Sequence, residues 1–146
     1  MIRYELKENM LTVTDFLRFR ELAGWNGVTQ KQGEMALKAT LLSITVVYQG
    51  QVIGIGRLIG DGQIMCYIQD VVVLPEFRNQ GIGRAIMQRL IAFVESVGIP
   101  HTTVRVGLFS AKGKEGFYEN LGFYTRPNHN RGAGMELVVP IRERDV

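Results

Sequence analysis

The clearest chemical signal in the sequence is the segment Arg78-Asn79-Gln80-Gly81-Ile82-Gly83-Arg84, which joins an apolar run to a predicted amphipathic helix. The first N–H groups of a helix have no partners within the helix, and they lie at the positive end of its dipole. Gly81 and Gly83 have no side chain that would keep a phosphate away from these groups, and Arg78 and Arg84 add positive charge. Glycines needed only for close packing are the alternative, which the two accompanying arginines disfavour. The segment therefore predicts a phosphate-binding helix N-terminus.

Two common phosphate-binding motifs are excluded by the spacing. A Walker loop requires Gly-x-x-x-x-Gly-Lys-Ser/Thr, which the sequence lacks. A dinucleotide fingerprint requires a third small residue where Ile86 lies and an acidic residue at the end of the next strand, where Leu108 and Phe109 lie. A second pair of glycines, Gly54 and Gly56, lies within a strand pattern and indicates a bulge or a close backbone approach.

The elements that flank the phosphate-binding loop follow from the spacing of apolar residues. An apolar run predicts a buried central strand over residues 64–73, which Pro75 ends. Residues 83–97 carry apolar side chains at helical spacing and predict an amphipathic helix. A strand predicted over 102–109 follows this helix, so we expect a crossover between two parallel strands.

The remaining elements complete an α/β pattern. One helix is predicted over 15–22 with Thr14 as its N-cap, and another begins at Thr29, which has capping-box spacing to Gln32. The other expected elements are strands over 2–5, 44–48, 52–59, 124–126 and 135–139 and a short helix over 114–120. The expected fold class is α/β, with a mixed, mostly antiparallel sheet flanked by helices.

Length and composition limit the class of protein. The 146 residues predict one domain, 1–146, without repeats or linkers. A lone cysteine, Cys66, rules out a secreted disulfide scaffold. The charged N-terminus and the absence of an apolar run of about 20 residues argue against a signal peptide or a membrane span, so we expect a cytoplasmic protein. The balance of 17 Lys and Arg against 14 Asp and Glu is mildly basic, but scattered charges disfavour nucleic-acid binding.

Two motifs in this sequence resemble those of one enzyme family. Arg78-x-x-Gly81-x-Gly83 resembles the pyrophosphate signature Arg/Gln-x-x-Gly-x-Gly/Ala of the GNAT superfamily of N-acetyltransferases. Phe117-Tyr118-Glu119-Asn120-Leu121-Gly122-Phe123 is similar to the second signature of this family, at the expected distance downstream. The resemblance covers essentially the whole chain. It implies a sheet with a V-shaped split between two central parallel strands, into which the pantetheine of acetyl-CoA inserts.

The resemblance also implies which residues hold acetyl-CoA, the acyl donor. The pantetheine would bond to the backbone of Val71, Val72 and Val73. The pyrophosphate would be held by Arg78, Asn79, Gln80, Gly81, Ile82, Gly83 and Arg84. Lys112 and Lys114 are either contacts of the 3′-phosphate or solvated surface residues. The two histidines lack the spacing of metal ligands, so no metal is expected.

Two residues are candidates for acid and base catalysis. Tyr118 matches the tyrosine that protonates the departing CoA thiolate in this family, although a packed aromatic residue would explain it as well. Ala111 stands where many relatives have an asparagine that contacts the cofactor. An amine attacks a thioester only when it is neutral, and many relatives use a carboxylate on the strand before the loop as base. Asp70 occupies that strand, and it is either this base or an anchor for a neighbouring loop.

In this family, acceptor specificity usually resides in the loop between the first two helices and in the loop that joins the last two strands. The first loop contains Trp25, which is either a pocket wall or a plug over the core. The second contains Arg126 and Arg131, which favour an acceptor with a carboxylate or phosphate.

Two further candidates for acceptor binding lie on the strand before the phosphate-binding loop. Strict alternation places Tyr67 and Gln69 on the opposite face of this strand from Asp70. There we expect them to line the acceptor pocket or to position a water molecule.

The resulting hypothesis is an N-acetyltransferase that moves the acetyl group of acetyl-CoA to a primary amine, most simply that of a small molecule, by direct attack in a ternary complex. Backbone amides near Val72 would polarise the thioester carbonyl. A protein or peptide amine is an alternative acceptor, and a CoA-binding regulatory module without turnover is an alternative of another class. Exposed edge strands are also compatible with a homodimer.

Overall fold

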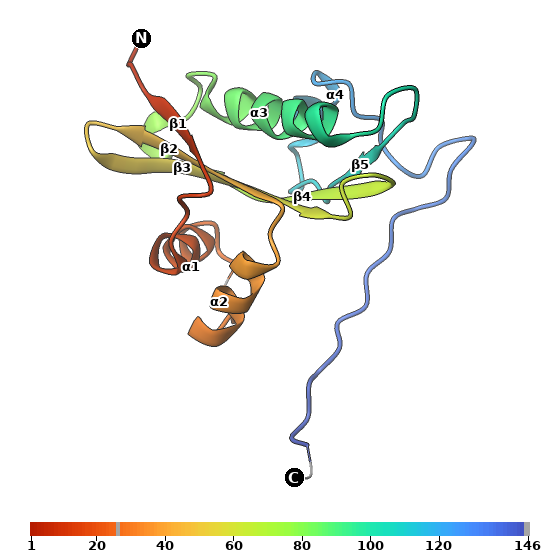
Figure 1. Cartoon of the computed structure of the whole chain (residues 1–146), viewed down its shortest axis with the longest axis horizontal. Coiled ribbons are helices and arrows are strands. Elements are labelled where there is room, and N and C mark those ends of the chain that lie inside the picture. The colour runs from red at the N-terminus through yellow and green to blue at the C-terminus, as the bar shows by residue number, and fades with distance from the viewer. Residues whose placement is uncertain (26, 145–146) are drawn as a thin grey trace. The chain divides into compact units, whose positions relative to one another are not determined.

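The chain divides into two units, Met1–Phe109 and Ser110–Val146, in a computed structural model that describes residues 1–25 and 27–144 (Figure 1). The first unit holds all elements but the last helix. Its strands are β1 (Glu5–Glu8), β2 (Leu42–Tyr48), β3 (Gln51–Gly60), β4 (Met65–Val73) and β5 (Arg105–Gly107). Its helices are α1 (Val13–Leu22), α2 (Gln30–Lys38), the short 3₁₀ turn η1 (Pro75–Phe77) and α3 (Ile82–Val97). The second unit holds α4 (Glu115–Glu119).

The five strands form one sheet in the order β1-β2-β3-β4-β5. Neighbouring strands are antiparallel from β1 to β4, and β4 and β5 are parallel. The parallel pair requires a crossover, which α3 provides as the sequence predicted. The predicted α/β class with a mixed, mostly antiparallel sheet is therefore confirmed. The first strand lies at Glu5–Glu8 rather than at 2–5, because its register pairs Glu5 with Val47.

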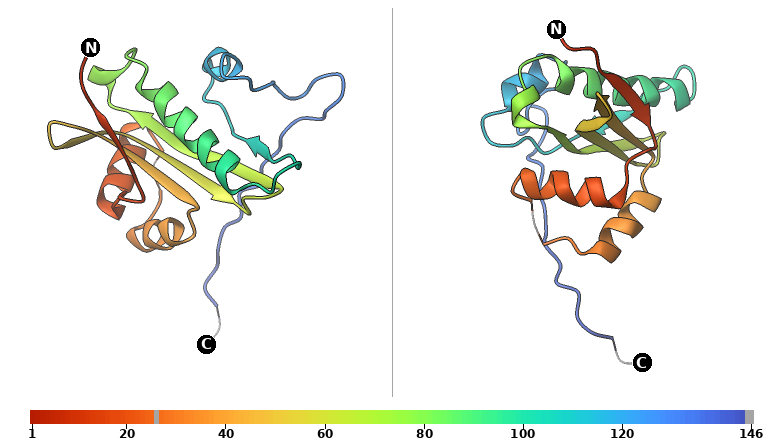
Figure 2. Two further views of the ribbon diagram at one scale, coloured as in Figure 1. Left: turned by 45° about the horizontal axis from the view of Figure 1, so that its top comes forward. Right: turned by 90° about the vertical axis from the view of Figure 1, so that its left-hand side faces the viewer.

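Helices cover both faces of this sheet. α1 and α2 lie on one face and α3 lies on the other, as the right-hand view of Figure 2 shows. Phe16 and Phe19 of α1 are fully buried on their side, and Ile86 and Leu90 of α3 are fully buried on the other. No helix of the described residues is long and apolar enough to cross a bilayer.

The helix starts follow local hydrogen bonding. Thr12, rather than the predicted Thr14, caps α1, because its hydroxyl accepts from the Asp15 N–H at 3.1 Å. The capping box at α2 is confirmed: Thr29 Oγ1 accepts from the Gln32 N–H at 3.1 Å, and Gln32 Oε1 accepts from the Thr29 N–H at 2.9 Å.

The second unit departs most from the sequence predictions. The strands predicted over 124–126 and 135–139 are absent from the described part of this unit, where pairing is limited to an isolated bridge between Asn128 and Arg131. Met135 and Leu137 are almost fully exposed. The apolar pattern indicates a propensity for strand, but a strand forms only where a second strand accepts its backbone hydrogen bonds.

Candidate functional site

The most distinctive feature of the sheet is an open edge along β4. β4 and β5 pair over three residues, from Met65 with Arg105 to Tyr67 with Gly107. β4 then continues to Val73, and no strand among the described residues pairs with its final six residues on the side of β5. An unpaired strand edge binds an extended ligand through main-chain hydrogen bonds.

The direction of the backbone groups along this edge follows from one hydrogen bond. The Leu74 N–H donates to the Ile53 carbonyl of β3 at 2.9 Å. Successive residues of a strand direct their backbone groups to opposite edges, so Val72 also faces β3, while Val71 and Val73 face the open edge. The Val73 carbonyl accepts from Arg78 Nε at 3.1 Å. Of the three valines predicted to bind through their backbones, two therefore face the open edge.

The open edge runs into the N-terminus of α3. After the η1 turn, Asn79 and Gly81 have φ angles of 62° and 79°, which bend the chain back into the helix. Unlike α1 and α2, α3 has no side-chain cap, and like α2 it has no acidic residue in its first turn. Its first N–H groups are therefore available to a ligand, and a Cβ placed on Gly81 would have no atom within 4 Å. The exposed side chains of Arg78 and Arg84 lie beside this terminus in sequence, so the donor set fits a phosphate group.

Asp70 lies inside the protein in an ion network. Its side chain is 0% exposed, and Oδ2 accepts from Arg57 Nε at 3.0 Å. Oδ1 accepts from Arg20 of α1. Arg57 Nη1 also donates to Thr40 Oγ1 at 3.1 Å. Both carboxylate oxygens are thus already acceptors for guanidinium groups.

Asp70 is also the site of a β-bulge. Its φ is 59°, and the register between β3 and β4 shifts here, from Ile55 with Val72 to Arg57 with Gln69. Paired residues of two strands project to the same face, and Arg57 reaches Asp70, so Gln69 and Asp70 lie on one face of the sheet. The prediction that they lie on opposite faces is wrong, because the bulge interrupts the alternation.

Tyr118 lies on α4 in the second unit. Its ring makes edge-to-face contacts with Phe117 and Phe123, at centroid distances of 5.0 and 6.1 Å. Burial raises the pKa of its phenol above the ordinary value of 10.0. The hydroxyl is therefore a proton donor throughout the neutral range. Lys112, Lys114 and Ala111, in the loop before α4, are exposed.

The predicted acceptor residues of the first unit lie on β4 and after α1. Tyr67 packs its ring edge-to-face on Phe109, with centroids 5.3 Å apart, and Phe109 is 56% exposed. Trp25 is 38% exposed, and the Arg20 guanidinium lies 5.8 Å from its ring. Asn26 of the same loop lies outside the described residues.

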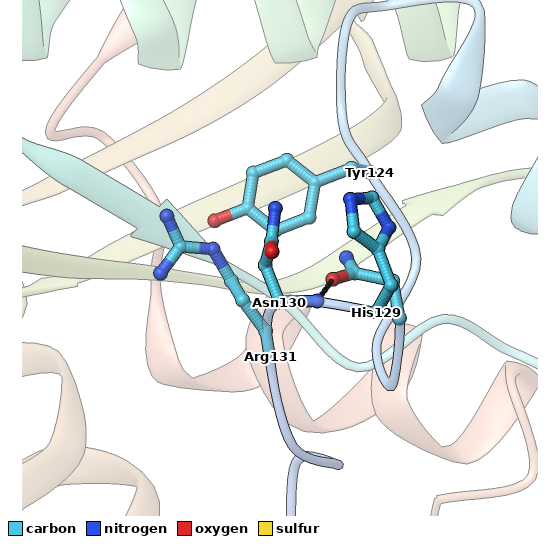
Figure 3. A pocket seen from close by; sticks show the side chains of 5 residues that line it. Tyr124, His129, Asn130 and Arg131 are labelled. Carbon is cyan, nitrogen blue, oxygen red and sulfur yellow. Dashed lines mark hydrogen bonds between the residues drawn. The ribbon is translucent and has the colours of Figure 1, made fainter.

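The second unit contains a pocket of about 320 Å³ in the loop after α4 (Figure 3). Its lining residues are Tyr124, Asn128, His129, Asn130 and Arg131. The Arg131 guanidinium lies 5.4 Å from the Tyr124 ring, and the Asn130 N–H donates to Asn128 Oδ1 at 3.0 Å. Arg126 is not one of the lining residues, and its Nε donates to the Gly132 carbonyl at 2.7 Å.

Two functional candidates, Arg20 and Arg57, were missed from the sequence. Arg57 lies within the buried strand β3, whereas Arg20 lies in a charged stretch of α1, directly after the buried Phe19. A charged residue placed where the pattern requires burial predicts a charged partner, and Asp70 is the one acidic residue in a buried strand pattern.

Comparison with known proteins identifies similar chains. A sequence profile of the acetyltransferase (GNAT) domain matches residues 41–125. GCN5-related N-acetyltransferase 1, chloroplastic, of Arabidopsis thaliana is 36% identical over 101 residues, which are 68% of this chain and 49% of that protein. Serotonin N-acetyltransferase 2, chloroplastic, of Oryza sativa subsp. japonica is 35% identical over 83 residues, 57% of this chain and 40% of that protein. The chain thus spans about half the length of these relatives or less.

Among solved structures, a probable acetyltransferase of unknown function from meticillin-resistant Staphylococcus aureus has a TM-score of 0.79 and 26% sequence identity. The similarity covers 94% of this chain and 100% of that one.

Proposed function

This chain belongs to the GNAT acetyltransferase family, and on that basis we propose that it transfers the acetyl group of acetyl-CoA to the primary amine of a small molecule. The observation that carries the proposal is the continuity of the open edge of β4 with the uncapped N-terminus of α3. An extended chain that ends in phosphates fits this surface, because the edge offers backbone hydrogen bonds and the helix offers N–H groups for an anion.

The residues proposed to hold acetyl-CoA divide by chemistry. Val71 and Val73 would bond to the pantetheine, and the α3 N-terminus would bind the pyrophosphate with the charges of Arg78 and Arg84. When bound, acetyl-CoA supplies an acetyl group activated as a thioester. Backbone N–H groups of β4 at the open edge would stabilise negative charge on its carbonyl oxygen.

Tyr118 is proposed to be the acid. Its phenol would donate a proton to the leaving thiolate, and its raised pKa keeps that proton in place until it is needed. The acceptor amine must lose a proton as well. The full burial of Asp70 and its two arginine partners support the anchoring role for Asp70, so the proposal assigns this proton to water.

The acceptor proposed is an amine with an apolar body. The half-exposed ring of Phe109 and its neighbour Tyr67 offer an aromatic wall beside β4, and Gln69 and Trp25 are the other proposed contacts in this unit. A relative named for serotonin, which is an arylalkylamine, supports this class. Arg126 is the acceptor-binding candidate of the second unit.

A panel assay tests the proposal. The purified chain is incubated with acetyl-CoA and, in separate reactions, an arylalkylamine, a polyamine, an amino sugar, a free peptide N-terminus and a peptide lysine, and products are detected by mass spectrometry. The proposal expects acetylation of the arylalkylamine above the no-enzyme rate. Transfer to the peptide amines alone would show that the acceptor is a protein or peptide amine and not a small molecule. Binding of acetyl-CoA without transfer to any amine would favour a regulatory module.

A further inference from the structure

We propose that Asp70 is a positioning residue, which together with Arg20 and Arg57 holds the β4 bulge and thereby turns the backbone groups of Val71 and Val73 toward the open edge. The three side chains will be called the Asp70 clamp. The identity of the ligand at that edge rests on the proposed function, whereas the conformation of β4 does not.

The bulge changes which residues of β4 face the edge shared with β5. Before the bulge, the Arg105 N–H donates to the Ile64 carbonyl at 3.0 Å, so even-numbered residues face this edge. After the bulge, the hydrogen bond from Leu74 to Ile53 shows that even-numbered residues face β3. The inserted residue produces this switch. Without it, Asp70 and Val72 would direct their backbone groups to the open edge.

The bulge requires a backbone conformation that most residues avoid. Asp70 has a φ of 59°, in the left-handed region, while it lies within a strand and carries a side chain. Aspartate tolerates this region better than most non-glycine residues, but the conformation still costs free energy. Such a residue persists where the surrounding structure holds it in place.

The Asp70 clamp provides that support from two neighbouring elements. Arg57 projects from β3 at the register position next to the bulge, and Arg20 reaches the same carboxylate from α1. Both guanidiniums also lie over the ring of Phe16, at 5.0 Å for Arg57 and 5.9 Å for Arg20. The hydrogen bond from Arg57 to Thr40 fixes its other end. A rotation of Asp70 into ordinary strand geometry would withdraw its carboxylate from both cations inside the protein, which is unfavourable.

Hydrogen exchange of the ligand-free protein tests the clamp directly. In the wild type, the N–H groups of Val72 and Leu74 should exchange slowly and those of Val71 and Val73 quickly, because only the first two are paired with β3. The ratio of the fast to the slow exchange rates will be called the exchange contrast. Arg57→Met, which removes one arginine of the Asp70 clamp, should reduce this contrast by about tenfold or more.

Two further variants complete the exchange experiment. Arg18→Met is the matched control, since Arg18 is also on α1 and pairs with an aspartate, Asp15, but is 42% exposed. Arg18→Met should leave the contrast unchanged. If Arg57→Met does not fold, Arg57→Lys retains the charge and should give an intermediate contrast. A folded Arg57 variant with the wild-type contrast would overturn the proposal.

Kinetics separate a positioning role from a base. If Asp70 acts through the bulge, Asp70→Asn and Arg57→Met should each weaken CoA binding by about tenfold, and together scarcely more than either alone. The pH profile of kcat/KM should keep its shape in Asp70→Asn. If Asp70 is the base, Asp70→Asn will lower kcat by the same factor in the wild type and in Arg57→Met, and it will remove the acidic limb of the pH profile. Either result would overturn the inference. A wild type that binds no CoA would refute the proposed function. The hydrogen-exchange experiment would then still test whether the Asp70 clamp holds the bulge, because it uses the ligand-free protein.

Discussion

Gly56 of β3 lies so close to Ile86 of α3 that a Cβ on the glycine would be 2.4 Å from Ile86 Cγ2. The absence of a side chain therefore sets the distance between helix and sheet at this point. Gly56 is also the residue of β3 that lies opposite the bulge, between the partners of Gln69 and Val72. Gly56 thus helps to position α3, whose N-terminus is the proposed pyrophosphate site. It also lies opposite the bulge of β4, the strand that would bind the pantetheine.

Gly56→Ala should lower the free energy of unfolding by about 1–3 kcal/mol, because the added methyl group overpacks the core between β3 and α3. Urea denaturation monitored by circular dichroism measures the change. Gly54→Ala is the matched control, since Gly54 lies on the same strand as Gly56. Its Cβ would lie 3.4 Å from Ile86 Cδ1, so the neighbouring side chains would need to move little. Equal destabilisation by the two variants would contradict this account of the packing.

The local elements could be predicted from sequence because each depends on residues close together in the chain. The apolar spacing of α3 and the capping box of α2 are local patterns, and both are confirmed. Gly54 and Gly56 predicted a bulge or a close backbone approach in β3, and Gly56 lies opposite the bulge, but the position of the bulge at Asp70 of β4 was not predicted. It depends on ion pairs with Arg20, 50 residues away, and with Arg57, 13 residues away, and no local pattern encodes such a pairing.

The predicted C-terminal strands are wrong for a different reason: the local pattern favours a strand, but a partner is missing among the described residues. The apolar and β-branched residues at 135–139 favour a strand locally, yet the segment has no strand partner in the part of the second unit that the structure describes. Strand formation needs two segments, and sequence pattern describes one of them. The same limit applies to the site: the sequence identified the phosphate-binding loop, but the direction of each backbone group in β4 required the register.

Tyr118→Phe should lower kcat by about 10²–10⁴-fold and leave the affinity for acetyl-CoA unchanged, because it removes the proposed acid without altering the ring contacts. Since burial raises the pKa of Tyr118 above its ordinary value of 10.0, wild-type kcat should show no loss from deprotonation of this residue at neutral and mildly alkaline pH. Steady-state rates across pH, with direct titration of acetyl-CoA, measure both effects. Tyr124→Phe, in the same unit and 54% exposed, should be nearly silent. A Tyr118→Phe variant with the wild-type kcat would show that the phenol is not the acid.

The turn between β3 and β4 should make stability depend on pH through Asp61. Its Oδ1 accepts from the N–H groups of Ile64 at 2.7 Å, Gln63 at 2.8 Å and Met65 at 3.1 Å, and these bonds lower the pKa of the carboxyl below its ordinary value of 3.8. A lowered pKa in the folded state means that the contribution is complete above pH 3.8 and is lost as the pH falls through the folded value.

Thermal unfolding of the wild type and of Asp61→Asn across pH tests this contribution. The difference in Tm should be constant near neutral pH and should shrink below pH 3.8. Glu95→Gln, an exposed position on α3, serves as the control for the loss of one negative charge. A difference in Tm that stays constant down to pH 2 would show that the hydrogen bonds to the carboxylate do not stabilise the turn.

The most direct test of the central claim is a calorimetric titration of acetyl-CoA into the wild type, Gly81→Glu and Gly50→Glu. Gly81 and Gly50 have φ angles of 79° and 75°, and a Cβ on either would meet no atom within 4 Å, so the two substitutions should cost similar stability, about 1–3 kcal/mol. Only Gly81 caps α3 at the proposed pyrophosphate site. The account predicts saturable binding at one site per chain in the wild type and in Gly50→Glu, and no measurable binding in folded Gly81→Glu. A folded wild type that does not bind acetyl-CoA, or a Gly81→Glu variant that binds it as the wild type does, would contradict the account.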